Sequence, residues 1–204
     1  MPNPSKTPHL FVIAGPNGAG KSTLSSTMLA HYGISAYDWD QSFYKKWKRF
    51  SLDPYVEEGI RNATNEEFES LANQSLNSKT SFAFETNFHV PAVIDLCLKF
   101  KEAGYTLVLY FLHLPNVQIA QERVNIRVSK GGHFVSEQTI ISRHTQGLIL
   151  LDTHFSQFDT CLILDASGDF GTKPMLSLEE GVVLEAFVSA EDLQTHLPTL
   201  AGLV

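Results

Sequence analysis

A glycine-rich stretch near the start of the chain constrains the fold more than any other feature. Residues 15–22 read Gly-Pro-Asn-Gly-Ala-Gly-Lys-Ser, which fits the pattern G-x-x-x-x-G-K-[S/T], and they directly follow the apolar run Leu10–Ala14. This pattern is a P-loop, in which glycines let consecutive backbone N–H groups turn around a phosphate. It joins a buried strand to a helix, expected over residues 22–31, whose N-terminal dipole also favours an anion. The sequence therefore predicts an α/β fold with a nucleoside triphosphate site.

The residues of this loop have separate expected roles. The expected nucleotide-binding set is Gly15, Pro16, Asn17, Gly18, Ala19, Gly20, Lys21, Ser22 and Thr23. We expect Lys21 to reach the β- and γ-phosphates of ATP, and the Ser22 hydroxyl to ligate the Mg²⁺ that accompanies the nucleotide. The eight histidines and two cysteines show no spacing typical of another metal site, so no further metal is expected.

Apolar runs alternate with helical patterns along the chain, which is typical of a parallel sheet covered by helices on both faces. The expected strands are 10–14, 34–38, 81–85, 105–113 and 160–165, and further helices are expected near 41–49, 54–76, 91–103, 117–128 and 136–155. A hairpin of residues 175–178 and 182–187 and a short helix from Ser189 are expected to follow. The sequence thus predicts one domain over residues 1–204, with a five-stranded parallel sheet, a lid segment at about 116–145 and a C-terminal hairpin and helix at about 168–204.

Composition excludes several classes of protein. With 204 residues and 43% hydrophobic content, the chain is long enough to bury one substantial core. The net charge of −7 argues against a nucleic-acid partner. Cys97 and Cys161 lie in apolar runs, which favours buried, reduced thiols. No stretch approaches 18 uninterrupted apolar residues and residues 1–9 contain no apolar leader, so we expect no membrane partner and a cytoplasmic location.

One basic and aromatic segment has two interpretations. Residues 45–49 read Lys-Lys-Trp-Lys-Arg, with further aromatic residues beside them, which would suit nucleic acid. However, Phe43, Trp47 and Phe50 recur at the spacing of one helix face. We therefore expect these three rings to pack inward while the lysines face water.

Acidic residues follow two of the expected strands, at the edge where parallel sheets bind their ligands. Asp38 and Asp40 end the second strand, and Asp40 is the candidate general base or Mg²⁺ ligand. The alternative for Asp40 is a helix N-cap, since a helix is expected from residue 41, whereas Asp38 is expected to lie still within the strand. Glu85 ends the third strand, where it can orient a substrate hydroxyl or a metal-bound water, or act as a turn residue.

Basic residues gather in a later segment of this acidic chain. Residues 115–146 hold four Lys or Arg against two Asp or Glu. Arg123 and Arg127 are i, i+4 neighbours on one helix face. We expect Arg127 and Arg143 to clamp a transferring phosphoryl group, with the pair at 131–132 as the hinge of a closing lid, while Arg123 is equally compatible with a solvated face.

Several motifs occur together in a fixed order. They are the P-loop 15–22 with Thr23, Asp40-x-Ser42-Phe43, Phe84-Glu85-Thr86-Asn87, and Arg127-x3-Gly131-Gly132-His133 followed by Arg143. This ordered set resembles the zeta-toxin family of P-loop kinases, over roughly residues 10–165.

The resemblance implies a three-layer P-loop kinase-like fold, ATP as phosphoryl donor and uridine-diphosphate-N-acetylglucosamine as acceptor, with an antitoxin protein as a partner. The roles it implies are Asp40 as general base, Lys21 and Ser22 as nucleotide residues, Glu85 as a substrate contact, and Arg127 with Arg143 as the phosphate clamp. For the acceptor we expect a wall formed by residues 85–87 and 41–50, which suits the hydroxyls and ring of a nucleotide sugar.

Two other functions stay open at this point. The first is a nucleotide-hydrolysing ATPase or switch, because residues 129–133 resemble an ABC signature and 161–165 a Walker B strand. Against it, Ala166 stands where an ABC protein needs its catalytic glutamate. The second is a degenerate nucleotide-binding module that acts through a partner, which the intact Lys21-Ser22 pair argues against.

Overall fold

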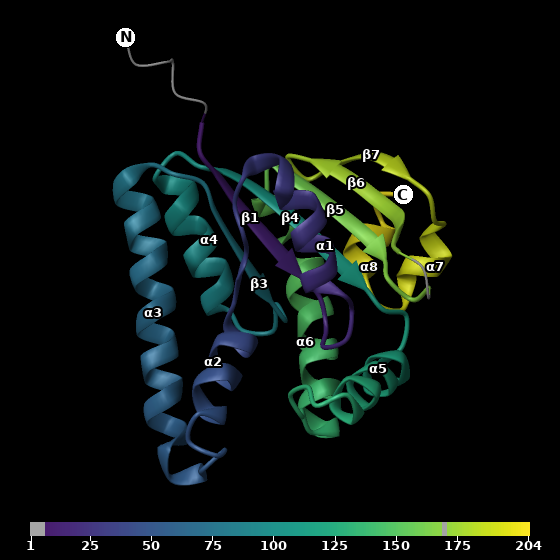
Figure 1. Cartoon of the computed structure of the whole chain (residues 1–204). Helices are drawn as coiled ribbons and strands as arrows, with labels where there is room; N and C mark the ends of the chain where they lie inside the picture. Colours follow the sequence, from purple (N-terminus) through teal and green to yellow (C-terminus); the bar gives the residue numbers. More distant parts are fainter. Residues whose placement is uncertain (1–6, 169–170) are drawn as a thin grey trace.

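The computed structural model describes residues 7–168 and 171–204, and the expectation for residues 1–6 lies outside the described range. One mixed sheet of seven strands forms its centre, in the order β2-β3-β1-β4-β5-β6-β7 (Figure 1). The strands are β1 (His9–Ala14), β2 (Tyr37–Asp38), β3 (Phe82–Thr86), β4 (Thr106–His113), β5 (Thr160–Asp165), β6 (Lys173–Glu179) and β7 (Val182–Ala186). The five strands β1 to β5 pair in parallel, and β1 lies between β3 and β4.

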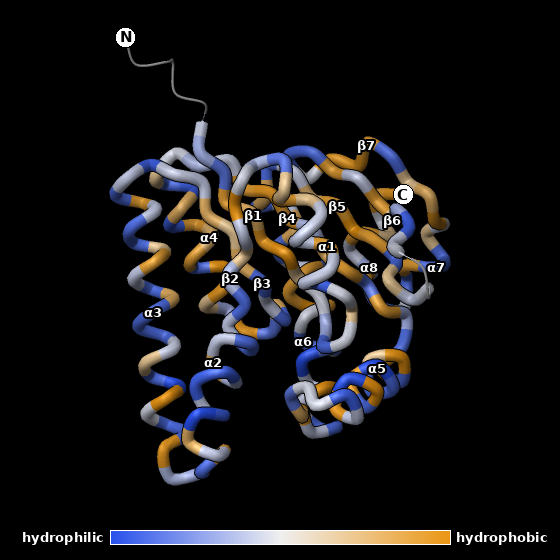
Figure 2. Tube along the Cα trace, viewed as in Figure 1, coloured by the Kyte–Doolittle hydropathy of each residue, from blue (hydrophilic) through white to orange (hydrophobic). Residues whose placement is uncertain are grey.

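Helices cover both faces of this sheet. The α-helices are α1 (Lys21–Met28), α2 (Trp39–Lys48), α3 (Glu57–Ser78), α4 (Ala92–Glu102), α5 (Val117–Ser129), α6 (Glu137–His154), α7 (Ala190–Gln194) and α8 (Pro198–Ala201), and short 3-10 helices span Leu29–Tyr32, Pro54–Val56 and Phe155–Gln157. Leu10 and Val12 of β1 face a core that includes residues of α4 and α6, while Phe11 and Ile13 face residues of α5 and the segment after α1. Because β1 is buried on both faces, it reads as an unbroken apolar run, and Figure 2 shows hydrophobic residues along the central strands.

The expectation of a five-stranded, wholly parallel sheet is wrong. Strand β6 pairs antiparallel with β5, and β7 pairs antiparallel with β6. Leu176 and Leu178 of β6 are fully buried in the same core as β1. Without β6, the outer backbone groups of β5 would be left unpaired at an edge, which explains physically why the sheet continues into the C-terminal segment.

Two further expectations have clear outcomes. Cys97 and Cys161 are buried and free, as predicted. The aromatic stripe is correct for Phe43, which is buried, and wrong for Phe50, which is 55% exposed. Helix α2 ends at Lys48, so Phe50 lies beyond the helical face on which the spacing placed it.

Candidate phosphoryl-transfer site

The P-loop links β1 to α1 by a backbone path that needs glycine. Gly15 has φ +141°, and a Cβ atom there would lie 2.6 Å from the carbonyl oxygen of Leu112 in β4. Gly18 has φ +79°, and a Cβ atom there would lie 3.1 Å from the Cβ atom of Arg123 in α5. The loop is therefore held between two neighbouring elements as well as by its own turn.

Lys21 lies at the start of α1 with its ammonium inside the site. Its Nζ donates to the carbonyl oxygens of Gly15 at 2.8 Å and Pro16 at 3.1 Å, and to Oδ1 of Asn87 at 3.1 Å. Burial lowers the pKa of this ammonium, although the nearby Asp40 and Glu85 carboxylates oppose the shift. The cation is thus held close to two acids, with polar partners for its N–H groups.

Glu85 joins the two serines of the first turns of α1. Its Oε2 accepts from the Ser22 hydroxyl at 2.8 Å, and its Oε1 accepts from the Ser25 hydroxyl at 2.7 Å. Burial raises the pKa of the Glu85 carboxyl in spite of these hydrogen bonds. Asp38 reaches the same hydroxyl of Ser22 at 3.5 Å, so an oxygen-rich cluster surrounds it. Sequence reasoning missed Ser25, whose i, i+3 spacing from Ser22 is the only signal for it.

The two aspartates after β2 differ in their contacts. Asp38 is the N-cap of α2 and its Oδ1 accepts from the backbone N–H of Gln41 at 2.9 Å, so the expectation that capping would compete at Asp40 is wrong. Asp40 lies in the first turn, where its Oδ2 accepts from Asn87 at 3.0 Å and from Arg143 at 3.3 Å. Burial alone raises the pKa of Asp40, but Arg143, Lys21 and the Asn87 hydrogen bond outweigh it and hold the pKa below its ordinary value.

Asn87 connects the base candidate to the P-loop. Its Oδ1 accepts from Lys21 and its Nδ2 donates to Asp40, so a single buried amide bridges cation and acid. The sequence marked Asn87 as part of a substrate wall and gave no sign of this bridge, because the residues it joins are 66 and 47 positions away.

The three arginines have different surroundings. The guanidinium of Arg143, on α6, donates to Oδ1 of Asn17 and to Asp40, both at 3.3 Å. Arg123 donates to backbone carbonyls, among them Ala166 at 2.6 Å and Ser167 at 2.9 Å. Arg123 therefore braces the loop after β5 against the P-loop, which answers the question that its sequence position left open.

Arg127 is exposed, and the second glycine of the pair that follows α5 packs against its side chain. A Cβ atom at Gly132 would lie 2.5 Å from Cγ of Arg127, and the backbone N–H of Gly132 donates to the Arg127 carbonyl at 2.9 Å. The guanidinium of Arg127 donates to the carbonyl of His133 at 3.0 Å. The His133 ring packs on the ring of Tyr44, from α2, with centroids 4.9 Å apart. These contacts bring the segment between α5 and α6 against the helix that carries Asp40.

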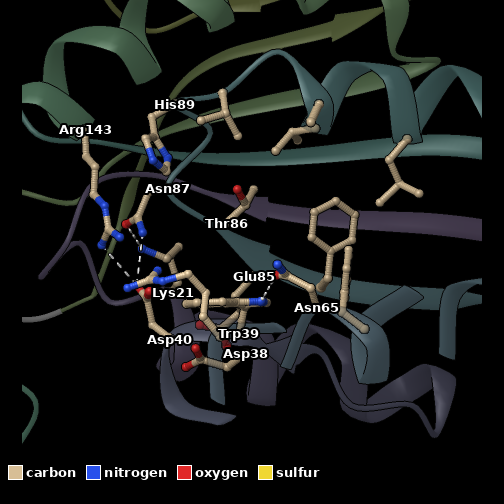
Figure 3. Close-up of a pocket in the computed structure, with 17 residues that line it drawn as sticks. Lys21, Asp38, Trp39, Asp40, Asn65, Glu85, Thr86, Asn87, His89 and Arg143 are labelled. Atoms are coloured by element: carbon tan, nitrogen blue, oxygen red, sulfur yellow. Dashed lines mark hydrogen bonds and ion pairs between the residues drawn. The ribbon is translucent and has the colours of Figure 1, made fainter. Parts of the chain in front are cut away.

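Two pockets meet at this cluster. The smaller, of 280 Å³, is lined by the P-loop with Arg123 and Arg127. The larger, of 460 Å³, lies towards α3 and α4 and also contains Arg143, Asn87 and His89, which Figure 3 shows beside Lys21 and Asp40. The residues that line both pockets are Lys21, Asp38, Asp40 and Glu85.

The wall of the larger pocket differs from the one expected. Residues 85–87 line it as predicted, but none of residues 41–50 does. In their place stand Asn65 and Phe68 of α3 and Val93 and Leu96 of α4. Burial lowers the pKa of His89, and its Nδ1 is buried without a hydrogen-bond partner among the described residues.

The described residues set limits on other kinds of site. They contain no group of three or more His, Cys, Asp or Glu side chains arranged to hold a metal ion. In the same part of the chain, no helix combines the length and apolar character that a membrane crossing requires.

The P-loop lies at the carboxyl edge of the parallel strands, and acids and arginines converge on it. The fold and this cluster together define the class of protein, which is a P-loop protein of the kinase type. A family description for zeta toxin matches residues 1–170, so the chain belongs to the zeta-toxin family and the resemblance stated from the motifs is confirmed.

Solved structures agree on the fold. A structure from the PezAT toxin-antitoxin system of Streptococcus pneumoniae matches with a TM-score of 0.67 and 17% identity, over 98% of this chain and 89% of that chain. A structure of AvrRxo1-ORF1:-ORF2 with ATP matches with a TM-score of 0.67 and 14% identity, over 94% of this chain and 64% of that one. No curated protein matches.

Proposed function

We propose that this protein is an ATP-dependent kinase that transfers the γ-phosphoryl group of ATP to a hydroxyl group of a small molecule. The observation that carries this proposal is the meeting of two pockets at one set of side chains. Lys21 and Asp40 line both the pocket formed by the P-loop and the larger pocket beside it. A transferase needs this arrangement, because donor and acceptor must approach one another from two sides of the catalytic groups.

In the proposed reaction, the acceptor oxygen attacks the γ-phosphorus of ATP. A new oxygen–phosphorus bond forms, the bond between the γ-phosphorus and the β–γ bridging oxygen breaks, and ADP leaves with that electron pair. Asp40 takes the hydroxyl proton, which its contacts support because Arg143 and Lys21 keep the carboxylate ionised. Lys21, Arg127 and Arg143 stabilise the negative charge on the transferring group.

The donor set beside the P-loop fits Mg²⁺ bound together with nucleotide phosphates. The Ser22 hydroxyl, the Glu85 carboxylate and the Asp38 carboxylate present only oxygen atoms, the ligand type that this ion prefers. Ser22 would hold the ion, and Glu85 and Asp38 would orient its bound waters. When bound, Mg²⁺ neutralises charge on the β- and γ-phosphates.

For the acceptor we propose a nucleotide sugar, with uridine-diphosphate-N-acetylglucosamine as the first candidate. The near end of the larger pocket offers Thr86, Asn87 and His89, which can hold sugar hydroxyls. Its far end offers apolar side chains for a ring. Family membership supports the same choice.

An ATPase or switch without an acceptor is the competing function, and the larger pocket argues against it because hydrolysis needs room only for water. The test is to incubate the pure protein with ATP, Mg²⁺ and a panel of nucleotide sugars, with mass spectrometry of the products. A nucleotide sugar heavier by one phosphoryl group supports the proposal. Free phosphate alone favours the ATPase, and phosphorylation only of other hydroxyl compounds keeps the kinase and rejects the acceptor.

We also propose an antitoxin partner and a cytoplasmic location. Membership of the zeta-toxin family and the toxin-antitoxin description of the PezAT structure support the first. The two buried, free cysteines suit a reducing compartment. Growth arrest on expression of the wild-type chain, with normal growth on expression of Asp40→Asn, would support a toxin. Normal growth with both would contradict it.

A further inference from the structure

Helix α6 carries Arg143, and the position of this helix decides which groups the guanidinium can reach. Arg143 donates to Oδ1 of Asn17, in the P-loop, and to Oδ2 of Asp40, on α2, both at 3.3 Å. Figure 3 shows the Arg143 side chain directed towards Asp40. Both distances are already slightly longer than a typical N–H···O hydrogen bond. A small displacement of α6 away from the site would therefore break both contacts.

A close backbone contact fixes one face of α6. Gly147 is buried, and a Cβ atom there would lie 2.9 Å from the carbonyl oxygen of Asn87. Real Cβ atoms essentially never lie so close to another heavy atom, so a larger residue would push α6 and the end of β3 apart. Gly147 and Arg143 are i, i+4 neighbours on the surface of the helix. The point where α6 meets Asn87 is thus one helical turn from Arg143.

A hydrogen bond fixes the neighbouring face of α6. Nε2 of His144 lies 2.9 Å from the carbonyl oxygen of Leu114, the residue after β4. A carbonyl oxygen can only accept, so Nε2 must carry the proton and donate. His144 is buried, and the ring of His196, from the segment between α7 and α8, lies beside it with centroids 6.5 Å apart. The end of β4 also borders the P-loop, because Leu112 lies against Gly15. This bond therefore sets the helix relative to the strand beside the P-loop.

We infer that His144 and Gly147 are positioning residues, which together fix α6 so that the Arg143 guanidinium reaches both the P-loop and Asp40. His144 sets the helix relative to the end of β4, and Gly147 sets it relative to the end of β3. Neither occurs among the described residues that line the two pockets of the site, so we expect neither to touch nucleotide or acceptor. The inference rests on the proposed function in one respect, which is that Arg143 acts on the transferring phosphoryl group.

Loss of either contact should lower the rate through Arg143. His144→Leu removes the hydrogen-bond donor, and Gly147→Ala adds a methyl group where α6 meets the end of β3. We expect each change to reduce kcat about tenfold and to leave KM for ATP nearly unchanged, because the contact that is lost acts on the transition state. His144→Gln can still donate to the same carbonyl through its amide and should recover most of the rate. His154→Leu, at the last residue of the same helix, is the matched control and should keep the full rate.

A spectroscopic signal from Arg143 tests the inference without turnover. The proton–nitrogen correlation signals of the arginine side chains are recorded on the full chain, and the Arg143 signal is identified by its absence in Arg143→Lys. We expect this signal to move in His144→Leu and in Gly147→Ala, and to keep its position in His144→Gln and in His154→Leu. If His144→Leu does not fold by circular dichroism, Gly147→Ala carries the test, since Ala is a better helix former than Gly. An Arg143 signal that stays in place in the folded variants would overturn the inference.

A second background separates an effect through Arg143 from a general loss of stability. In Arg143→Lys the guanidinium is already absent, so adding His144→Leu or Gly147→Ala should lower the rate by less than about twofold. A full tenfold loss in that background would show that the two residues act elsewhere, and it would overturn the inference.

These outcomes are distinct from a failure of the kinase proposal. Movement of the Arg143 signal in a protein that phosphorylates no acceptor would retain the positioning roles and reject the proposed function. Phosphorylation of an acceptor at the wild-type rate by folded His144→Leu and Gly147→Ala proteins would do the reverse.

Discussion

The proposed donor side and the proposed acceptor side of this site are built in different ways. The donor side is a continuous stretch of chain, the P-loop, fixed by backbone geometry at Gly15 and Gly18 and by Arg123 at the adjacent loop. The acceptor side is assembled from side chains of α2, α3, α4 and β3 that are far apart in sequence. A phosphate site made of backbone groups is specified by a short, contiguous sequence motif. A pocket between helices depends instead on how the helices pack.

Because of this difference, we expect one set of residues to carry out the reaction and another set to determine which acceptor binds. The groups proposed to carry out the reaction, Lys21 and Asp40, line both pockets and are held by Asn87 and Arg143. The residues that would distinguish one acceptor from another lie on α3 and α4, away from those contacts. We therefore expect substitutions of Lys21 and Asp40 to lower the rate, and substitutions of the α3 and α4 residues that line the larger pocket to alter the choice of acceptor.

Removing the proposed base should have the largest effect. Asp40→Asn keeps the shape of the side chain but cannot accept the hydroxyl proton, so we expect the catalytic rate to fall by roughly 100-fold to 10,000-fold, with ATP affinity nearly unchanged. Single-turnover kinetics and nucleotide titration measure the two quantities. Asp38→Asn should reduce the rate less, since Asn can replace Asp as the N-cap. If the two variants exchange these results, the base is Asp38.

Removing the P-loop cation should come next. Lys21→Ala should lower phosphoryl transfer by about 100-fold or more, because it removes the cation that the P-loop carbonyls hold inside the proposed phosphate site. Folding should be retained, since the change removes a buried cation and its desolvation cost. Wild-type turnover by a folded Lys21→Ala protein, checked by circular dichroism, would reject the proposed phosphate site.

Substitution of Arg127 or Arg143 by Lys should lower the catalytic rate less than the two changes above, because it alters the geometry of the side chain and keeps its charge. Arg127→Lys or Arg143→Lys keeps the charge but removes the planar fork, so we expect the rate to fall by about tenfold to 100-fold. Arg123→Lys is the comparison, and there the main effect should be lower thermal stability, because Arg123 holds backbone carbonyls. Full activity of both Lys variants would return Arg127 and Arg143 to the solvated-face interpretation.

The contact between Gly132 and Arg127 gives a prediction with a smaller expected effect. Gly132→Ala places a methyl group against the Arg127 side chain and carbonyl, so the guanidinium should shift and the rate should fall about tenfold. Gly59→Ala, on α3, meets nothing within 4 Å and should leave the rate unchanged. In an Arg127→Lys background, Gly132→Ala should cost less than in the wild type. An equal cost in both backgrounds would show that Gly132 does not act through Arg127.

The smallest expected change is a shift in pH dependence. Because Asp40 must be ionised to accept a proton, the rate should fall as the pH drops through its pKa, which Arg143 and Lys21 hold below the ordinary value. Arg143→Gln removes one of these cations, so the pKa of Asp40 should rise and the acidic limb of the rate profile should move to higher pH. Arg127→Gln is the control and should leave the limb in place. A profile unchanged by Arg143→Gln would assign the limb to another group.

Much of the sheet was predictable because its signal is local. Strands β1, β3, β4 and β5 are nearly continuous apolar runs, and each was expected within about two residues of its observed bounds. The second strand was expected over 34–38 and covers only Tyr37–Asp38, the two residues that pair with Phe84 and Glu85 of β3. The C-terminal pair β6 and β7 was foreseen as separate from the parallel sheet, and its pairing with β5 was not.

The sequence by itself determined the donor side of this protein, because the P-loop pattern, the apolar strand before it and the helix after it are contiguous. It also indicated segments, around the ends of β2 and β3 and in α5 and α6, whose acids and arginines line the two pockets, since parallel strands end at one edge. Only the tertiary structure decided which partners they have. The Asn87 bridge, the bracing role of Arg123 and the lining of the larger pocket all join residues far apart in the chain. Such contacts depend on the packing of helices against the sheet, which no local pattern records.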